Sequence, residues 1–248
     1  MSSSSPSGFR RSDDALEHLI ARQFDRMHGA PYLPRSTTAD DFRVAAALEF
    51  FGSISQNRLI DVGCGKGRLA EHLLARGAFV FGVDPSSEML APAGRIRGLA
   101  LALASATALP SRDGSFDFAV CAEVLQHIPH PERAVREVAR VLRKGGKALF
   151  IDRNALALDK RTLLPVTLAK RLEELRGKWM YPRDFPFREH RFLVWKMKRL
   201  IGNHFSQVKV SYLKENWMIS PRPKHALHWF VYTLLPFVRE FVAWKAVK

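Results

Sequence analysis

The chain has 248 residues, of which 47% are hydrophobic and 25% are charged, so it can bury a full α/β core and does not have the composition of a disordered protein. Two cysteines are too few for a disulfide framework and favour a reducing, cytoplasmic compartment. The net charge of +15 is unevenly placed, because residues 153–248 hold 20 of the 39 Lys and Arg but only 7 of the 24 Asp and Glu, together with all five tryptophans. This basic, aromatic-rich part favours an anionic partner, either a membrane or a nucleic acid.

The N-terminal part predicts a tail followed by two helices. Residues 1–12 are Ser-rich, lack the apolar stretch of a signal peptide and are expected to be disordered. Asp13 or Asp14 can cap a helix over 13–27, and a second helix is predicted over 38–51. Residues 13–56 are therefore interpreted as an N-terminal helical cap.

A strand, a glycine-rich turn and a helix follow in direct succession. Residues 58–62 are an apolar run interrupted only by Asp61, which suits a strand buried in a parallel sheet. Gly63, Gly65 and Gly67 then occupy alternate positions, and a helical pattern begins at once. Residues without a Cβ allow tight backbone turns and close approach to a ligand, so this stretch is a candidate binding turn.

The next predicted strand brings an acidic residue to the same region. Residues 78–83 end on Asp84, which stands 21 positions after Gly63, near the roughly 20-residue offset at which an acid meets ribose hydroxyls. Arg68 occupies the position where a dinucleotide fingerprint requires its third glycine. The pattern therefore favours a nucleoside cofactor without a pyrophosphate.

Strands and helices continue to alternate through the middle of the chain. The predicted elements are a helix over 87–93, strands over 99–104 and 116–121, a helix over 132–142 stopped by Gly145 and Gly146, and a strand over 148–151. This alternation predicts a doubly wound α/β sheet, whose ligand belongs at the carboxyl ends of the strands.

The last ninety residues do not show this regular alternation of strands and helices. Helices are predicted over 161–176 and 191–201, a strand over 207–213, and an antiparallel partner for it over 217–220. We therefore expect one domain over 57–223 that carries an insertion at about 160–203.

Five segments resemble, in the same order, the motifs of a known family. They are LIDVGCGKG (59–67), VFGVDPSSEML (80–90), ASATALPSRDGSFDFAV (104–120), CAEVLQHI (121–128) and VREVARVLRKGGKALFIDRN (135–154). From about 57 to 154 the chain resembles the class I S-adenosylmethionine (SAM)-dependent methyltransferases with a type 11-like core, with some similarity to the ubiquinone-pathway O-methyltransferases. The resemblance implies SAM as cofactor and a Rossmann-like sheet of seven strands. It also implies N-terminal helices that cover the active site, although such helices can simply pack on the sheet.

The resemblance further implies which residues bind the cofactor. They are Asp61, Gly63, Cys64, Gly65, Gly67, Asp84, Pro85, Ser105, Ala106 and Ala122. Asp84 matches the acid that binds the ribose. Ser105 stands where these enzymes often carry an acid for the adenine amino group, and a hydroxyl accepts that bond more weakly. Adenine recognition is therefore expected to depend on the backbone around Ala106.

His127 and Glu123 are the predicted catalytic residues. His127 follows the fourth strand at the edge facing the transferred methyl group, and an imidazole there can take the proton of a hydroxyl acceptor. The alternative is that His127 only caps or packs the following turn. In the ubiquinone-pathway enzymes acids and a histidine here can hold a divalent cation, but Gln126 occupies the position of the second acid. An amide is a poorer ligand for a hard cation, so no obligatory metal is predicted.

Residues 224–248 are predicted to form an amphipathic segment outside the family core. The apolar run over 226–238 is too short to span a membrane. Trp229, Tyr232 and Trp244, with flanking basic residues such as Lys224 and Arg239, suit an anionic membrane surface. The alternative is a helix packed on the domain or in a dimer interface. On the membrane interpretation, deleting this segment leaves a folded, SAM-binding core.

Together these patterns predict a SAM-dependent methyltransferase that acts on a small or lipidic acceptor at oxygen, in the cytoplasm or at the inner face of the membrane. An RNA (tRNA) methyltransferase is the alternative among enzymes, supported by the basic charge although no RNA-binding module is visible. A non-catalytic SAM-fold adaptor is the alternative of a different class. The intact glycines and Asp84 count against the adaptor.

Overall fold

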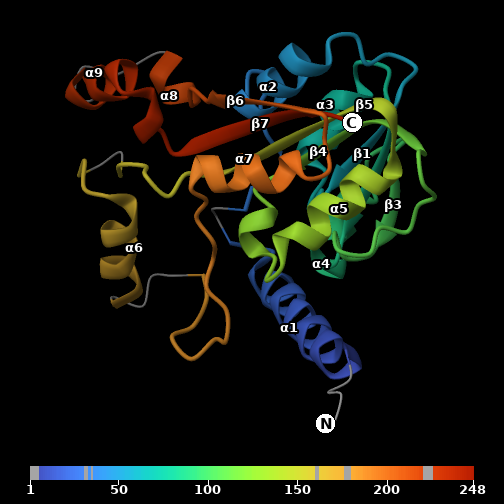
Figure 1. The fold of residues 1–248 in the computed structure, drawn as a ribbon, viewed down its shortest axis with the longest axis horizontal. Helices are drawn as coiled ribbons and strands as arrows, with labels where there is room; N and C mark the ends of the chain where they lie inside the picture. Colours follow the sequence, from blue (N-terminus) through green and yellow to red (C-terminus); the bar gives the residue numbers. More distant parts are fainter. Residues whose placement is uncertain (1–5, 31–32, 35, 160–161, 176–179, 220–225) are drawn as a thin grey trace.

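A single seven-stranded sheet forms the centre of the molecule (Figure 1). The structure, a computed structural model, describes residues 6–248 except 31–32, 35, 160–161, 176–179 and 220–225. The strands are β1 (Arg58–Val62), β2 (Phe79–Asp84), β3 (Ala100–Leu103), β4 (Phe116–Ala122), β5 (Leu142–Arg153), β6 (Gln207–Tyr212) and β7 (Phe241–Val247). Their order in the sheet is β3-β2-β1-β4-β5-β7-β6, which confirms the predicted Rossmann-like, doubly wound architecture.

The strand order reverses between β1 and β4, because β2 and β3 lie on one side of β1, and β4 and β5 lie on the other. The carboxyl ends of β1 and β4 flank this switch point. Strands β1 to β5 are parallel, and β1 pairs with β2 on one side and β4 on the other. In open sheets of this kind the ligand binds in the crevice beyond such a switch point.

Helices cover both faces of the sheet. They are α1 (Pro6–Met27), α2 (Phe42–Phe51), α3 (Arg68–Leu74), α4 (Ser87–Ala93), the short 3₁₀ turn η1 (Leu125–His127), α5 (Pro131–Val141), α6 (Val166–Leu175), α7 (Val194–Gly202), α8 (Asn216–Ile219), α9 (Ala226–Leu234) and the 3₁₀ turn η3 (Pro236–Val238). One face packs against α5 and α7, and the other packs against α2 and α3. Neighbouring residues of β5 divide between the two, since Phe150 belongs to the first core and Leu149 to the second.

Strand β7 corrects the prediction for the C-terminal segment. It lies between β5 and β6 and is antiparallel to both, so it is an interior strand of the sheet. Trp244 is fully buried in the core, and its indole nitrogen donates to the carbonyl of Val194 at 3.2 Å. The boundary predicted at residue 224 is therefore wrong for 241–247. Deleting 224–248 would remove an interior strand, so the structure argues against the expectation of a folded core after deletion.

The predicted partner of β6 is likewise corrected. Most of residues 217–220 form the short helix α8, and β7 takes the place expected for them. Gly145 and Gly146 do not stop a helix, because α5 ends at Val141 and the two glycines lie inside β5. Gly145 has a φ of +73°, which suits a bend within this long strand.

The N-terminal helices differ from the prediction in their starting points. Helix α1 begins at Pro6, so the prediction of a disordered tail is wrong for 6–12, and residues 1–5 lie outside the described part of the chain. Helix α2 begins at Phe42, where the Asp41 side chain accepts from Arg43 N and caps the helix. Helix α2 packs on the sheet, whereas Ile20 of α1 packs against Tyr181 and Phe187.

Candidate active site

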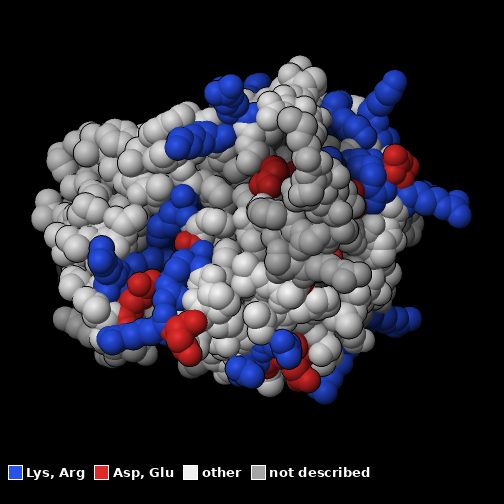
Figure 2. All heavy atoms as spheres, turned by 60° about the horizontal axis from the view of Figure 1, so that its bottom comes forward, with Lys and Arg blue, Asp and Glu red and all other residues white. Residues whose placement is uncertain are grey.

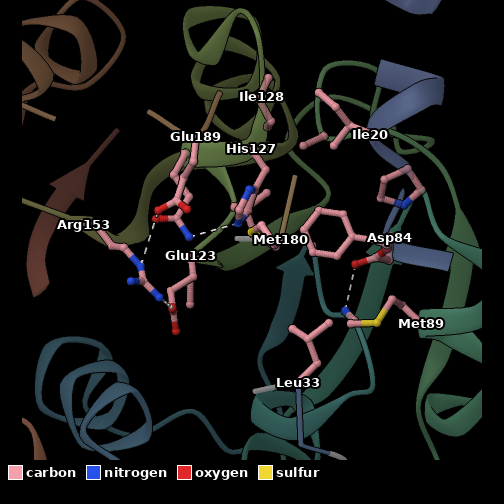
Figure 3. Close-up of a pocket in the computed structure, with 18 of the residues that line it drawn as sticks. Ile20, Leu33, Asp84, Met89, Glu123, His127, Ile128, Arg153, Met180 and Glu189 are labelled. Atoms are coloured by element: carbon pink, nitrogen blue, oxygen red, sulfur yellow. Dashed lines mark hydrogen bonds and ion pairs between the residues drawn. The ribbon is translucent and has the colours of Figure 1, made fainter. Parts of the chain in front are cut away.

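One cavity of about 1060 Å³ lies at the carboxyl ends of β1, β2, β4 and β5. Single-ligand pockets typically have roughly 300–1,000 Å³, so this volume suits a cofactor together with a second molecule. Predicted site residues that line it are Gly63, Cys64, Gly65, Asp84, Pro85, Ser105, Ala106, Ala122, Glu123 and His127. Figure 3 shows Asp84 and Met89 on one side and Glu123, His127, Arg153 and Glu189 on the other. We refer to these two parts as the Asp84 end and the His127 end.

The glycine turn forms the floor of the Asp84 end. Gly63 has a φ of +69°, and a Cβ built on it would lie 2.2 Å from the Cγ2 atom of Val124. Gly65 has a φ of +51°, and its N–H donates to Asp84 Oδ2 at 2.9 Å. Backbone conformation and space both require glycine at position 63.

The Asp84 carboxylate is held by backbone donors on both of its oxygens. Oδ2 accepts from Gly65 N, and Oδ1 accepts from Ser86 N at 2.9 Å. Burial raises the pKa of Asp84 to about 6, even though the two N–H groups favour its charged form. A carboxylate can accept about four hydrogen bonds, so capacity remains for the hydroxyl groups of a ligand.

Asp61 and Gly67 are the two predicted residues that do not line the cavity. Asp61 is 3% exposed, and its Oδ2 has no hydrogen-bond partner in the part of the chain that the structure describes. Burial, with the Asp84 charge, raises the pKa of Asp61 to about 7. Gly67 precedes α3 with a φ of +76°, and a Cβ there would lie 2.5 Å from Ile96 Cδ1. Both residues therefore lie on the side of the turn that faces away from the cavity. The Oδ2 atom of Asp61 accepts no hydrogen bond from the described residues.

Ser105 is engaged by an acid that the sequence analysis missed. Its hydroxyl donates to Glu17 Oε2 at 2.6 Å, and the Thr107 hydroxyl donates to the same oxygen at 2.8 Å. Glu17 comes from α1 and lines the cavity. A carboxylate therefore stands beside the position where related enzymes often carry one, although it arrives from a distant part of the chain.

The two cysteines are free and buried. Burial raises the pKa of both thiols, so neither is a thiolate at neutral pH. Gly82 leaves room for Cys64, because a Cβ on this glycine would lie 2.8 Å from the Cys64 sulfur. Cys64 thus fills space under the turn as a small apolar residue.

His127 lies in η1 with both ring nitrogens engaged. Nδ1 is 3.0 Å from the Tyr181 hydroxyl, and Nε2 is 3.0 Å from the side-chain nitrogen of Gln126. The Phe24 and His127 rings pack in a T-shaped arrangement at a centroid distance of 5.0 Å. Burial lowers the pKa of His127 to about 4, so the ring is neutral near pH 7. A neutral imidazole can accept a proton once one nitrogen exchanges its present partner for a ligand.

Glu123 faces the cavity as an ionised acid between two arginines. Its Oε1 accepts from Arg43 Nε at 2.6 Å, and its Oε2 lies 3.5 Å from an Arg153 nitrogen. Burial raises its pKa, but the Arg43 and Arg153 charges outweigh this and hold the pKa below its ordinary value. The backbone at Glu123 has a φ of +61°, an uncommon conformation for a residue with a Cβ and one that occurs at functional sites.

These ion pairs belong to a larger network that forms the wall of the His127 end (Figure 3). Arg153 pairs with Glu240 at 2.7 Å and lies 3.7 Å from Glu189. Lys170 of α6 pairs with Glu189 at 2.8 Å. Within the described residues, no group of three His, Cys, Asp or Glu is placed to hold a metal ion.

Helix α1 and the loop after it cover the Asp84 end. The Lys66 ammonium in the glycine turn donates to the carbonyls of His28 and Leu33. Asp25 of α1 accepts from the Ser86 hydroxyl at 2.6 Å. The first helix therefore covers the site, as the resemblance implied, whereas α2 packs on the sheet and also contributes Phe42 and Arg43 to the lining of the cavity.

Comparisons with known proteins agree with this geometry. A family model described as a methyltransferase domain matches residues 60–150, which run from β1 into β5. The ubiquinone biosynthesis O-methyltransferase of Sodalis glossinidius is 36% identical over 124 residues, or 46% of this chain and 49% of that protein. The protein of the same name from Ralstonia nicotianae is 39% identical over 113 residues, or 42% and 47%. The chain thus spans about half the length of the curated relatives it matches.

A solved structure extends the likeness over most of the fold. The S-adenosylmethionine-dependent methyltransferase from Mesorhizobium loti matches with a TM-score of 0.62 and 20% identity, and the match covers 84% of this chain and 99% of that one. Residues 60–150 thus carry a methyltransferase domain, and the fold around them is that of the SAM-dependent methyltransferases. The family implies SAM as its cofactor.

The Asp84 end of this methyltransferase domain fits SAM. Gly63 and Gly65 leave space that any Cβ would fill, and Asp84 has hydrogen-bond capacity for ribose hydroxyls. Glu17, which lines the cavity, can accept from an adenine amino group. When bound there, SAM supplies a methyl group on a sulfonium, which is an activated leaving group.

Proposed function

We propose that this methyltransferase transfers the methyl group of SAM to an oxygen atom of a small or lipid-like acceptor. The observation that carries the proposal is the single cavity that joins the glycine turn and Asp84 to His127. Near His127 the cavity is lined by Ile20, Phe24, Ile128, Val166 and Met180, so an apolar acceptor body fits beside a polar reacting group.

Little chemistry is required of the chain beyond positioning and removal of one proton. Holding the reactants in line converts a bimolecular reaction into an effectively unimolecular one, which accounts for much of the acceleration. As an acceptor hydroxyl attacks, its proton passes to a nitrogen of the neutral His127 ring. Glu123 stays ionised between Arg43 and Arg153 and, in this proposal, holds the wall beside the acceptor.

The relatives support oxygen as the methylated atom. Both carry the name ubiquinone biosynthesis O-methyltransferase. Since they match over about half their length, the acceptor class is proposed from the cavity and a quinol is one candidate within it. The surface charge offers weaker support for RNA, because Lys and Arg on the face in Figure 2 stand in separate groups, many of them beside Asp or Glu.

Labelled SAM tests the reaction and its alternatives together. The purified chain is incubated separately with catechols and quinols, with a lipid extract and with RNA. Transfer to the phenolic or lipid fraction is the expected result. Labelled RNA would favour the tRNA-modifying alternative, and no transfer by a chain that binds S-adenosylhomocysteine (SAH) would favour the adaptor.

Asp84→Ala tests the cofactor end of the proposal. Losing hydrogen bonds to a charged group typically costs about 1.5–3 kcal/mol, so SAH should bind roughly tenfold or more weakly to the variant. Calorimetry on both proteins gives the answer, with circular dichroism to show that the variant is folded. Equal affinities would show that Asp84 does not bind the ribose.

We also propose that the acceptor reaches the cavity from a membrane surface. Helices α6 and α9, which lie at the same end of the molecule in Figure 1, expose large apolar residues. On α9 and just after it these are Leu227, Trp229, Phe230, Leu234, Leu235 and Phe237, and on α6 they are Leu168, Leu172 and Leu175. Helix α6 also lines the cavity through Val166, Ala169 and Lys170. Among the described helices none is long and apolar enough to cross a membrane, so the contact would be interfacial.

The structure changes the chemistry expected of this contact. Tyr232 and Trp244 are buried, and the Arg239 guanidinium donates to the carbonyls of Tyr232 and Tyr212 at 3.0 and 2.9 Å. These three residues were predicted to face lipid and they do not. Lys224 lies outside the described residues. Apolar burial, rather than attraction by these basic residues, is therefore the proposed source of binding.

Vesicle flotation tests the membrane proposal without deleting β7. The triple variant Leu227→Gln, Phe230→Gln, Leu234→Gln should lose most of its vesicle binding, while Phe79→Gln, an exposed aromatic at the start of β2, should retain it. Binding by the parent chain should persist in zwitterionic vesicles. If the parent chain floats with neither zwitterionic nor anionic vesicles, the proposal is refuted.

A further inference from the structure

The guanidinium of Arg191 is buried beside the His127 end and has no hydrogen-bond partner among the residues that the structure describes. Its Nε and both terminal nitrogens have almost no solvent exposure, and none donates to another described residue. Arg191 lines the cavity that also holds His127 and Glu123. Buried charges in proteins are normally paired, so a complete set of idle donors requires an explanation.

The backbone holds Arg191 in a defined place. On one side of it His190 N donates to the carbonyl of Gln126, next to His127, at 2.8 Å. On the other side Phe192 N donates to the carbonyl of Arg153 at 3.0 Å. The side chain therefore projects from a segment that is anchored to both η1 and the end of β5.

The neighbouring charges are already matched with one another. Glu189 pairs with Lys170 at 2.8 Å, and Glu240 pairs with Arg153 at 2.7 Å. Glu189, Glu240 and Asp159 exert an electrostatic attraction on Arg191, but none of them forms an ion pair with it. Removal from water lowers the pKa of Arg191, yet a guanidinium remains protonated at any physiological pH.

A guanidinium presents five N–H donors in a planar fork, which matches carboxylate and phosphate groups. We propose that Arg191 binds an oxyanion carried by the methyl acceptor, and so selects acceptors that have a carboxylate or phosphate group in addition to the reacting hydroxyl. This inference rests on the proposed function, since it names the acceptor class of the same cavity. Arg191 is thus a specificity-determining residue, while His127 takes the proton.

Small anions test this without knowledge of the true acceptor. Thermal melts of the full chain with SAH are recorded in benzoate, in phenyl phosphate and in uncharged benzamide, at equal concentration and ionic strength. Either anion should raise the melting temperature of the parent chain more than benzamide does. Arg191→Met should abolish this difference, and Arg199→Met, an exposed arginine on α7, should preserve it. By calorimetry, the anion should bind roughly tenfold or more weakly to Arg191→Met.

Two further measurements separate binding from a structural role. Without anion, Arg191→Met should melt at the same or a higher temperature than the parent, because an unpaired buried charge has been removed. Arg191→Lys keeps the charge but loses the fork, so it should fold and still bind benzoate more weakly. An equal response of the parent chain and Arg191→Met to both anions would overturn the proposal. The relative effect of benzoate and phenyl phosphate distinguishes a carboxylate from a phosphate.

The same samples keep the two proposals apart. SAH binding is measured first, and Arg191→Met should retain it. If the parent chain does not bind SAH, the proposed function fails while the anion response can still be read. If SAH binds and the anion response does not depend on Arg191, only the present inference fails.

Discussion

The Asp84 end and the His127 end of the cavity are built in different ways. The Asp84 end consists mainly of backbone: glycines with positive φ and the N–H groups of Gly65 and Ser86, all within one short stretch of chain. The His127 end consists of charged side chains from distant segments, namely Arg43, Glu123, Arg153, Lys170, Glu189 and Glu240. One end is made by local conformation and the other by long-range ion pairs.

The two ends therefore suit two different functions of one cavity, which are cofactor binding and the choice of acceptor. A floor built from backbone tolerates few substitutions, because any Cβ at Gly63 would meet Val124. A network of long side chains can change its members while the sheet stays the same, so acceptor choice can vary over one fold. Substitutions at the two ends should therefore have separable effects on cofactor binding and on turnover.

The largest effect on SAH binding is expected at Gly63. Gly63→Ala places a Cβ against Val124 in a left-handed backbone conformation. Overpacking costs about 1–3 kcal/mol and the conformation about 1–2 kcal/mol, so SAH binding measured by calorimetry should fall roughly 30-fold or more. Gly202→Ala is the matched control, because a Cβ there meets nothing within 4 Å.

A double variant identifies the cause of that loss. Val124→Ala removes the two methyl carbons that the new Cβ would meet, so it should partly restore SAH binding to Gly63→Ala. Full binding by the single variant would mean that the floor can move, and the contrast between the two ends would be wrong.

The second effect concerns turnover alone. His127→Ala should lower kcat by roughly 100-fold and leave SAH affinity nearly unchanged, as expected when a general base is removed. Tyr181→Phe keeps the imidazole and removes only the group that contacts Nδ1, so its effect should be much smaller. Normal turnover by His127→Ala would reduce His127 to a packing residue.

The pH profile of kcat sharpens the same prediction. The proposed base acts in its neutral form, and burial lowers its pKa from the ordinary 6.5 to about 4. Turnover should therefore be level from pH 8 to about 5 and fall only below that, with circular dichroism to verify folding. A decline that begins near pH 6.5 would show that the base has an ordinary pKa.

The third effect falls on stability and belongs to the His127 end. Glu123→Gln removes the negative charge that balances the positive charges of Arg43 and Arg153. Because the carboxylate keeps 18% exposure, the loss should be about 1–3 kcal/mol, below that of a fully buried pair. Urea unfolding measures it, and Glu49→Gln, which removes a carboxylate that is 73% exposed from its pair with Lys245, should cost far less.

Acid should erase the difference between Glu123→Gln and the parent chain. The folded pKa of Glu123 lies below its ordinary value of 4.5, so its stabilisation is complete above 4.5 and is lost as the pH falls through the folded pKa. Repeating the urea titrations at pH 7 and below pH 4 checks this sign. A difference that grew in acid would contradict the ion-pair explanation.

Local signals account for the parts of the fold that could be predicted. The strand before Gly63, the turn and Asp84 are adjacent in sequence, and the structure brings them together at one edge of the sheet. Strand β7 was missed because its residues follow a long apolar run with helical spacing, and only pairing with β5 and β6 makes Phe241–Val247 extended. Pairing between distant strands overrides such a local pattern.

The candidate site likewise contains residues that the sequence could predict and residues that it could not. His127 and Glu123 could be placed at the edge of β4 from motif position alone, although their roles stay predictions. Arg43 and Glu189 carry no local pattern that marks them, since Glu123, which pairs with Arg43, and Lys170, which pairs with Glu189, lie far from them in the sequence. Long-range ion pairs of this kind become visible only in three dimensions.

The smallest effect, at the Asp84 end, tests a side chain there that comes from a distant part of the chain. Glu17 of α1 accepts from Ser105 and Thr107 and lines the cavity. If it also accepts from the adenine amino group, Glu17→Ala should weaken SAH binding by only about 2- to 10-fold, because a single half-exposed hydrogen bond is typically worth about 0.5–1.5 kcal/mol. Asp14→Ala, one turn earlier on the same helix and also at the cavity, is the matched control.

A cofactor analogue distinguishes a direct contact from a structural effect of Glu17. S-inosylhomocysteine carries a carbonyl where SAH carries the amino group, so the parent chain should bind it more weakly than SAH by calorimetry. Glu17→Ala should lose this preference, because the acceptor for the amino group is gone, whereas Asp14→Ala should keep it. Undiminished preference in Glu17→Ala would return adenine recognition to the backbone around Ala106, and Asp84 would then be the main side chain in a cofactor site otherwise built from backbone.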